Sequence, residues 1–116
     1  MKELLTEVQG SVWREYQRAA IKFGPANNGP HESYAVILEE LEEAQSDGRA
    51  FEYNMREFWN AVKANNTTKC QLQQMQTLAE HAAAEWVQVA AMCYKAQQKK
   101  ADKSNTGRQD GGQRHL

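Results

Sequence analysis

The sequence of 116 residues predicts an all-α protein, a bundle of four helices in a single domain. Three observations lead to this expectation. Apolar residues recur at steps of three and four over long segments, which is the period of a helix. Clusters of proline, glycine and asparagine separate those segments. The hydrophobic content of 41% is sufficient for one modest core.

The charge and hydropathy of the chain argue against several classes of protein. A net charge of −1 provides no general attraction to nucleic acid or to anionic membranes. No apolar run approaches the length of a membrane span, and the start MKELLTEVQG carries acids where a secretory signal is apolar. Cys70 and Cys93 form no metal-binding pattern, so we expect reduced thiols. We therefore expect a cytoplasmic protein with no membrane or nucleic-acid partner.

The first helix is predicted over about Leu4 to Phe23, where apolar residues follow the helical period. Residues 24–30 then hold two prolines and two glycines, which indicates a loop. Pro30 suits the first position of the next helix, with Gly29 or Asn28 as its cap. The polar side chains of this region have two interpretations, plain turn chemistry or recognition of a ligand at the start of the helix, and they are Asn27, Asn28 and His31.

Three further helices are expected. The second runs to about Ser46, where Asp47-Gly48 indicates a turn, and the third spans about Phe51 to Asn65. The fourth spans about Lys69 to Gln98 and carries an apolar seam with coiled-coil spacing, formed by Leu72, Met75, Ala79, Ala82, Trp86, Val89 and Cys93. Residues 1–98 thus form the predicted domain, and the polar residues 99–116 a disordered tail.

The predicted second helix carries an acidic segment. In HESYAVILEELEEA, four carboxylates follow an apolar run, and they belong to Glu39, Glu40, Glu42 and Glu43. Glu40 and Glu43 share one side of a helix, where like charges repel unless a cation is bound. One interpretation is a solvated acidic face, which needs no ligand. The other is a magnesium site, because hard divalent cations bind clustered carboxylate oxygens.

The last helix carries a second stripe beside its seam. The members are Leu78, His81, Glu85, Gln88, Met92 and Lys95, so the middle of the stripe is polar and its flanks include apolar residues. Glu85 is either a boundary residue paired with a lysine or part of a polar patch inside a buried strip. Lys95 either complements the negative end of the helix dipole or contacts an anion.

These segments together resemble a known family. Residues 39–43 form an EExxE motif, and the combination of HESYAVILEELEEA, FWNAVKANN and AAAEWVQVAAMCYKA resembles the MazG-like, all-α nucleoside triphosphate pyrophosphohydrolases. The likeness is closest to their short phage- and prophage-type members, and it covers about Trp13 to Ala96. The resemblance implies a bundle of four main helices that is completed by forming a homodimer or homotetramer.

The resemblance also implies an activity. It is the hydrolysis of a nucleoside triphosphate between the α- and β-phosphates, to the monophosphate and pyrophosphate, with Mg²⁺ as cofactor and Mn²⁺ as a substitute. A phage-type member implies a deoxynucleotide substrate, with dGTP or dATP the first to test, in the cytoplasm of a bacterial or phage-infected cell.

The family's functional positions carry over to named residues. Glu40 and Glu43 correspond to metal ligands, Glu39 is an acid that ligates or orients, and Glu85 begins the second acidic pair. That pair commonly reads ExxD in the family, but here it reads ExxQ, so Gln88 offers an amide oxygen without charge. Lys95 is the candidate for phosphate contact, and the base and sugar contacts are expected from Asn27, Asn28 and His31.

A different class of function is also open. The chain can be a helical interaction module without catalysis, in which the seam of the last helix binds a partner. That interpretation predicts no nucleotide turnover dependent on a divalent cation.

Overall fold

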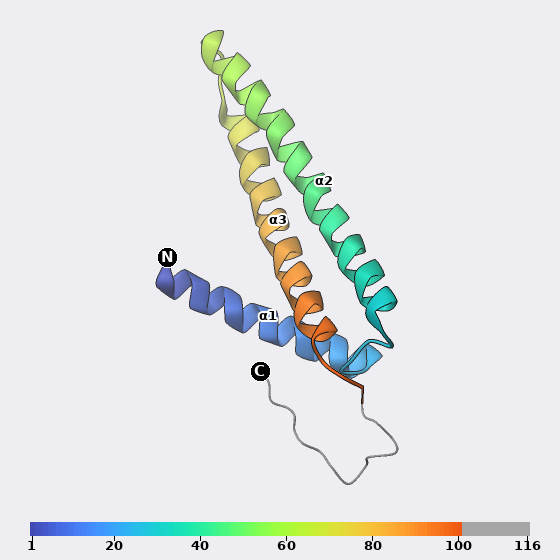
Figure 1. The fold of residues 1–116 in the computed structure, drawn as a ribbon. Coiled ribbons are helices and arrows are strands. Elements are labelled where there is room, and N and C mark those ends of the chain that lie inside the picture. The colour runs from blue at the N-terminus through green and yellow to red at the C-terminus, as the bar shows by residue number, and fades with distance from the viewer. Residues whose placement is uncertain (101–116) are drawn as a thin grey trace.

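The computed structural model describes residues 1–100, which form three helices and no strand (Figure 1). Helix α1 spans Lys2–Phe23, α2 spans Pro30–Lys63 and α3 spans Lys69–Ala96. The prediction of an all-α protein is confirmed. Helices α2 and α3 lie side by side as an antiparallel hairpin, and the C-terminal half of α1 crosses the C-terminal end of α3 while its N-terminal half projects away (Figure 1). Residues 101–116 of the predicted tail lie outside the described residues.

The predicted turn at Asp47-Gly48 is wrong. Helix α2 continues through both residues, so the expected second and third helices are one helix of 34 residues. A glycine inside a helix costs only about 1 kcal/mol, and packing of α2 along α3 on both sides of Gly48 outweighs that cost. The described part of the chain therefore holds three helices in place of the four that the sequence predicted.

The loop between α1 and α2 follows the sequence prediction. Gly24 ends α1 with a φ of 94°, a left-handed conformation that favours glycine. Gly29 caps α2 and Pro30 is its first residue, as expected. The Tyr16 hydroxyl donates a hydrogen bond of 2.8 Å to the carbonyl oxygen of Pro25, which fixes the loop against α1.

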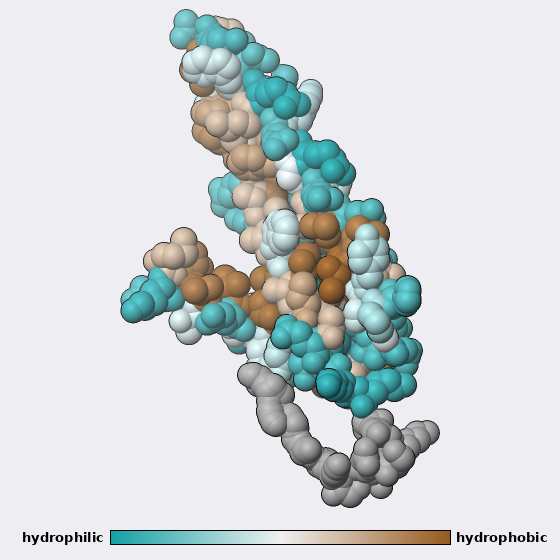
Figure 2. Space-filling model, in the orientation of Figure 1, coloured by the Kyte–Doolittle hydropathy of each residue, from teal (hydrophilic) through white to brown (hydrophobic). Residues whose placement is uncertain are grey.

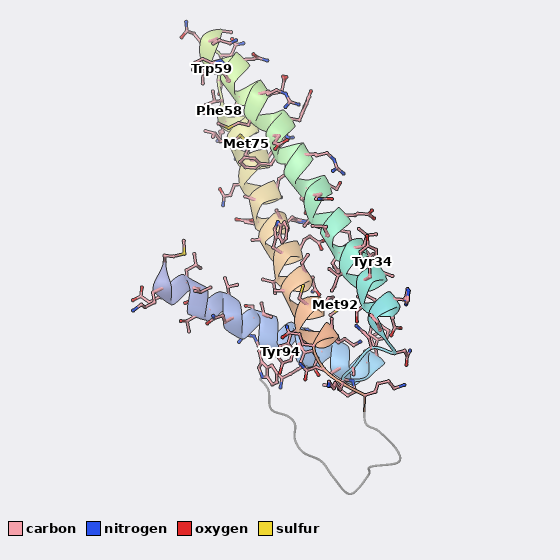
Figure 3. All side chains as sticks on the ribbon, in the orientation of Figure 1. Tyr34, Phe58, Trp59, Met75, Met92 and Tyr94 are labelled. Carbon is pink, nitrogen blue, oxygen red and sulfur yellow. The ribbon has the colours of Figure 1, made fainter. Side chains whose placement is uncertain are left out.

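The buried core lies where α1 crosses the hairpin. Tyr16 of α1 packs on Ala91 and Met92 of α3, and partly buried residues surround them, namely Val12, Ala19, Ala20, Val36, Ile37 and Tyr94. The Tyr16 and Tyr94 rings meet edge to face, 4.7 Å apart between centroids. The core therefore joins all three helices at one end of the hairpin, close to the labelled Met92 and Tyr94 in Figure 3.

Much apolar surface remains open on the single chain. The Cα radius of gyration is 19.4 Å, against about 13 Å for a compact domain of 100 residues. No large side chain among residues 1–100 is fully buried, and Trp86 in the predicted seam is 51% exposed. Apolar surface extends from α1 towards the lower half of the hairpin (Figure 2). None of the three helices is both long and apolar enough to cross a membrane.

The continuity of α2 can be tested at its glycine. A Cβ added at Gly48 meets no atom within 4 Å, and Gly48 has a helical conformation, so Gly48→Ala should raise the free energy of unfolding by about 0.5–1 kcal/mol. Gly24→Ala is the matched control, because its site is equally open but its φ is positive, and it should destabilise. Urea unfolding at one protein concentration measures both variants. A loss of stability in Gly48→Ala would contradict the continuous helix and favour the predicted turn at this position.

Candidate functional site

Three carboxylates from two helices meet near the middle of the hairpin. Glu40 and Glu43 come from α2 and Glu85 from α3, and one ligand oxygen of each lies within 4.8 Å of the others. Glu40 and Glu43 share a face of α2 because they are three residues apart. The antiparallel packing of α2 on α3 brings Glu85, more than forty positions later in the chain, to that face.

The electrostatics of this acidic cluster are unfavourable without a counter-ion. Burial raises the pKa of Glu40 above its ordinary value, and the charges of Glu43 and Glu85 raise it further. Burial is also the largest cause that raises the pKa of Glu85. The charge of Glu43 and a side-chain hydrogen bond with Glu43 raise that pKa further. Among residues 1–100, no lysine or arginine nitrogen lies within 4.0 Å of any of the three carboxylates. The predicted alternative, in which Glu85 pairs with a lysine, is therefore not what the described residues form.

The donor set suits a hard divalent cation. Carboxylate oxygens are the ligands that Mg²⁺ prefers, at about 2.0–2.1 Å, so two oxygens on one ion are at most about 4.2 Å apart. The observed span of 4.8 Å is slightly wider, and small side-chain rotations of Glu40, Glu43 and Glu85 can close it. The cluster contains no thiol or imidazole ligand, which disfavours zinc.

A cavity of about 810 Å³ adjoins this cluster. Glu40 belongs to both, because it lines the cavity and contributes an oxygen to the acidic cluster. Exposed Glu32 and Glu39 also line the cavity but lie outside the group of three. The apolar part of the lining is formed by Ala19, Phe23, Pro25, Ala26, Val36 and Met92. The cavity thus has an acidic wall beside a largely apolar surface.

The opposite charge comes from Lys95, near the end of α3. Its residue is only 6% exposed, yet no carboxylate of the described residues lies within 4.0 Å of its amino group. The Lys95 Nζ lies 5.7 Å from the centre of the Phe23 ring, a cation–π contact. Lys99 and Lys100 line the cavity as well. A buried cation without an acidic partner is costly, so Lys95 is a candidate contact for an anionic ligand.

The structure separates the three polar residues expected to contact base and sugar. Asn27 and Asn28 line the cavity, whereas exposed His31 does not. The Asn27 amide donates to the Ser33 hydroxyl at 2.8 Å. The Asn28 side-chain oxygen accepts from Lys100 Nζ at 2.8 Å, so the first residues of the predicted tail fold back on this loop. Both amides keep polar atoms that these bonds do not use.

Gln88 lines the cavity as the sequence suggested, but it has a partner that the sequence analysis missed. Its Nε2 donates to Glu15 Oε1 of α1 at 2.6 Å. Glu15 is 73 positions away, so no local pattern could have indicated the pair. Phe23 was predicted only as an apolar helix residue, and its place beside Lys95 required the fold.

Asp47 is a second residue that was missed. Its charge raises the pKa of Glu85, whereas His81 lowers it. Asp47 follows Glu43 by four residues, so it continues the acidic face if the helix is unbroken. The sequence held that signal, but the predicted turn at this position hid it.

The raised pKa values predict how stability depends on pH without divalent cations. A carboxyl group whose pKa is raised on folding binds more protons in the folded state, so its contribution to stability is lost as pH rises above 4.5. Glu40→Gln and Glu85→Gln remove this loss, so each should be more stable than the wild type at pH 7 but not below pH 4.5. Urea unfolding across pH in the presence of chelator measures the difference. The control is Glu42→Gln, an exposed residue outside the cluster, and an equal gain there would refute the argument.

Comparison of the chain with models of protein families, with curated proteins and with solved structures finds no match. The resemblance to MazG-like enzymes therefore depends on the quoted motifs alone. In the structure, Glu40, Glu43 and Glu85 converge beside a cavity that Lys95, Lys99 and Lys100 also line.

Proposed function

We propose that this protein is a Mg²⁺-dependent nucleoside triphosphate pyrophosphohydrolase, with a short phage-type MazG-like chain. The observation that carries the proposal is the meeting of Glu40, Glu43 and Glu85 at the edge of a cavity that also holds the buried Lys95. Acids can hold the cation while the lysine attracts phosphate. A solvated acidic face gives no role to the buried Lys95, which has no carboxylate of the described residues within 4.0 Å.

The chemistry assigns a role to each residue. Water attacks the α-phosphorus, the bond from that phosphorus to the bridging oxygen breaks, and pyrophosphate leaves with the electron pair. Bound Mg²⁺ would supply charge neutralisation and a lower pKa for the water, with Mn²⁺ as a substitute. Glu40, Glu43 and Glu85 hold the cation, and Glu39, on the cavity wall, orients the water or takes its proton. Lys95 binds phosphate oxygens at the other end.

The substrate we propose is a single deoxynucleoside triphosphate, with dGTP and dATP as the first candidates. The cavity volume of about 810 Å³ falls in the range of about 300–1,000 Å³ that is usual for small-molecule sites. Phe23, Val36 and Met92 offer apolar surface for a base, and Asn27 and Asn28 offer amide groups at the rim. His31 would contact substrate only if the loop or a second chain brings it closer.

We further propose that the chain forms a homo-oligomer, a dimer or tetramer, in which two α2–α3 hairpins make the four-helix bundle. Seam residues on α3 support this, because Leu72 and Trp86 are 46% and 51% exposed on one chain. Met55 and Trp59 of α2 are also exposed. A second hairpin laid along these residues would bury them, which is the usual source of stability in helical bundles.

The alternative, a helical interaction module without catalysis, is favoured by the same exposed apolar residues. It gives no reason for a cavity that is lined by both acids and a buried lysine. The two functions are separated by the activity of Glu40→Gln. The interaction module predicts no turnover in the wild type and only relief of repulsion in the variant.

The activity has a direct test. Wild-type protein should release pyrophosphate and the monophosphate from a deoxynucleoside triphosphate with Mg²⁺ or Mn²⁺, and release should stop with chelator. Glu40→Gln should lower kcat by more than about 100-fold, because loss of an outer-shell partner alone costs about 10–100-fold. Glu42 is an exposed acid of α2 that does not belong to the cluster, so Glu42→Gln should keep near-wild-type activity.

The assay should cover all natural ribo- and deoxynucleoside triphosphates, and circular dichroism should show that both variants stay helical. Absence of turnover for every nucleotide in the wild type, or equal losses in Glu40→Gln and Glu42→Gln, would contradict the proposed enzyme.

Oligomer formation predicts a separate result. Analytical ultracentrifugation of the wild type should give a dimer or tetramer mass, and Trp86→Glu should shift the mass towards the monomer because it places a charge in the seam. Gln73→Glu is the matched control, because it adds the same charge at an exposed position of α3 outside the seam. A monomeric wild type at micromolar concentration would contradict the bundle of two hairpins.

A further inference from the structure

We infer that Glu15 is a positioning residue that turns the carbonyl oxygen of Gln88 away from α1 and towards the cation site. This inference rests on the proposed function, and it concerns a helix that carries none of the candidate metal ligands. The juxtaposition that points to it is the hydrogen bond from Gln88 Nε2 to Glu15 Oε1, 2.6 Å long, between α3 and α1.

The bond fixes which end of the amide faces which way. A glutamine amide has a donor end and an acceptor end, whereas an ionised carboxylate only accepts. Glu15 therefore selects the NH₂ end of Gln88, and the carbonyl oxygen is left on the other side. Gln88 is one helical turn after Glu85 and lines the same cavity as Glu40. A neutral carbonyl oxygen there can bind the cation or accept a hydrogen bond from its water.

Glu15 is itself held in place. Its Oε2 atom pairs with the Arg18 guanidinium, one turn later on α1, while Oε1 accepts from Gln88. The Glu15 side chain is only 23% exposed, and the Arg18 side chain is 68% exposed. The two oxygens therefore have separate partners, and the arginine restrains the carboxylate that accepts from Gln88.

A purely structural role makes a different prediction. Among the described residues, the bond from Gln88 to Glu15 is the side-chain hydrogen bond that connects α1 with α3. Its loss would therefore lower the free energy of unfolding whether Glu15 has a structural role or a positioning role. Only a positioning role also alters cation affinity, because Glu15 lies outside the cluster of Glu40, Glu43 and Glu85. Partners of metal ligands typically change affinity or activity by about 10–100-fold when they are removed.

The test compares Mn²⁺ binding, measured by electron paramagnetic resonance of the free ion, with urea unfolding. Glu15→Leu should weaken Mn²⁺ binding by about 10–100-fold. Gln88→Glu alone sets two carboxylates against each other and should lower stability. Adding Glu15→Gln to Gln88→Glu restores a donor and an acceptor in reverse order, so the double variant should regain the stability and bind Mn²⁺ at least as tightly as the wild type. Glu7→Gln, an exposed acid of α1, should change neither quantity.

The outcomes separate the inference from the proposed function. Wild-type protein that binds no Mn²⁺ and turns over no nucleotide overturns both. If the wild type binds and hydrolyses but Glu15→Leu binds Mn²⁺ equally well, only the positioning role of Glu15 is refuted. Should Glu15→Leu not fold, the decision passes to the double variant, whose failure to recover relative to Gln88→Glu contradicts the pairing.

Discussion

The repulsion among three carboxylates is the constraint around which this structure is arranged. Antiparallel packing of α2 on α3 holds Glu40, Glu43 and Glu85 with oxygens within 4.8 Å, where burial and mutual charge raise the pKa of Glu40 and of Glu85. The exposed side chain of Glu43 leaves this group open to solvent. A divalent cation bound among the three carboxylates would offset their repulsion, as the proposed function requires.

The distribution of charge across the cavity supports the same view. Glu32, Glu39 and Glu40 line the cavity together with the buried Lys95, which lies close to the Phe23 ring. Keeping these opposite charges more than an ion-pair distance apart forgoes a stabilising contact. The separation makes sense for a ligand that has a polyanionic part, since phosphate oxygens can bridge between a cation and a lysine.

Sequence reasoning predicted the helical class, the loop at residues 24–30 and the acids that the fold brings together. These succeeded because helical period, proline and glycine placement, and face-sharing at steps of three are local properties. The turn at Asp47-Gly48 was wrong because long-range packing overrode a weak local preference of glycine. Glu15 was missed for a related reason, since its partner Gln88 is distant in sequence and the crossing of α1 over α3 has no local signature.

The fold leaves Trp86 and other apolar residues exposed on one chain, and the proposed homo-oligomer would bury them. The proposed cation site nevertheless consists of Glu40, Glu43 and Glu85 of a single chain. The most direct measurement is anomalous diffraction from crystals of the wild type grown with Mn²⁺. An anomalous peak coordinated by Glu40, Glu43 and Glu85 is the expected result. Carboxylates turned to solvent without a bound ion at saturating Mn²⁺, or a peak only at other residues, would contradict it.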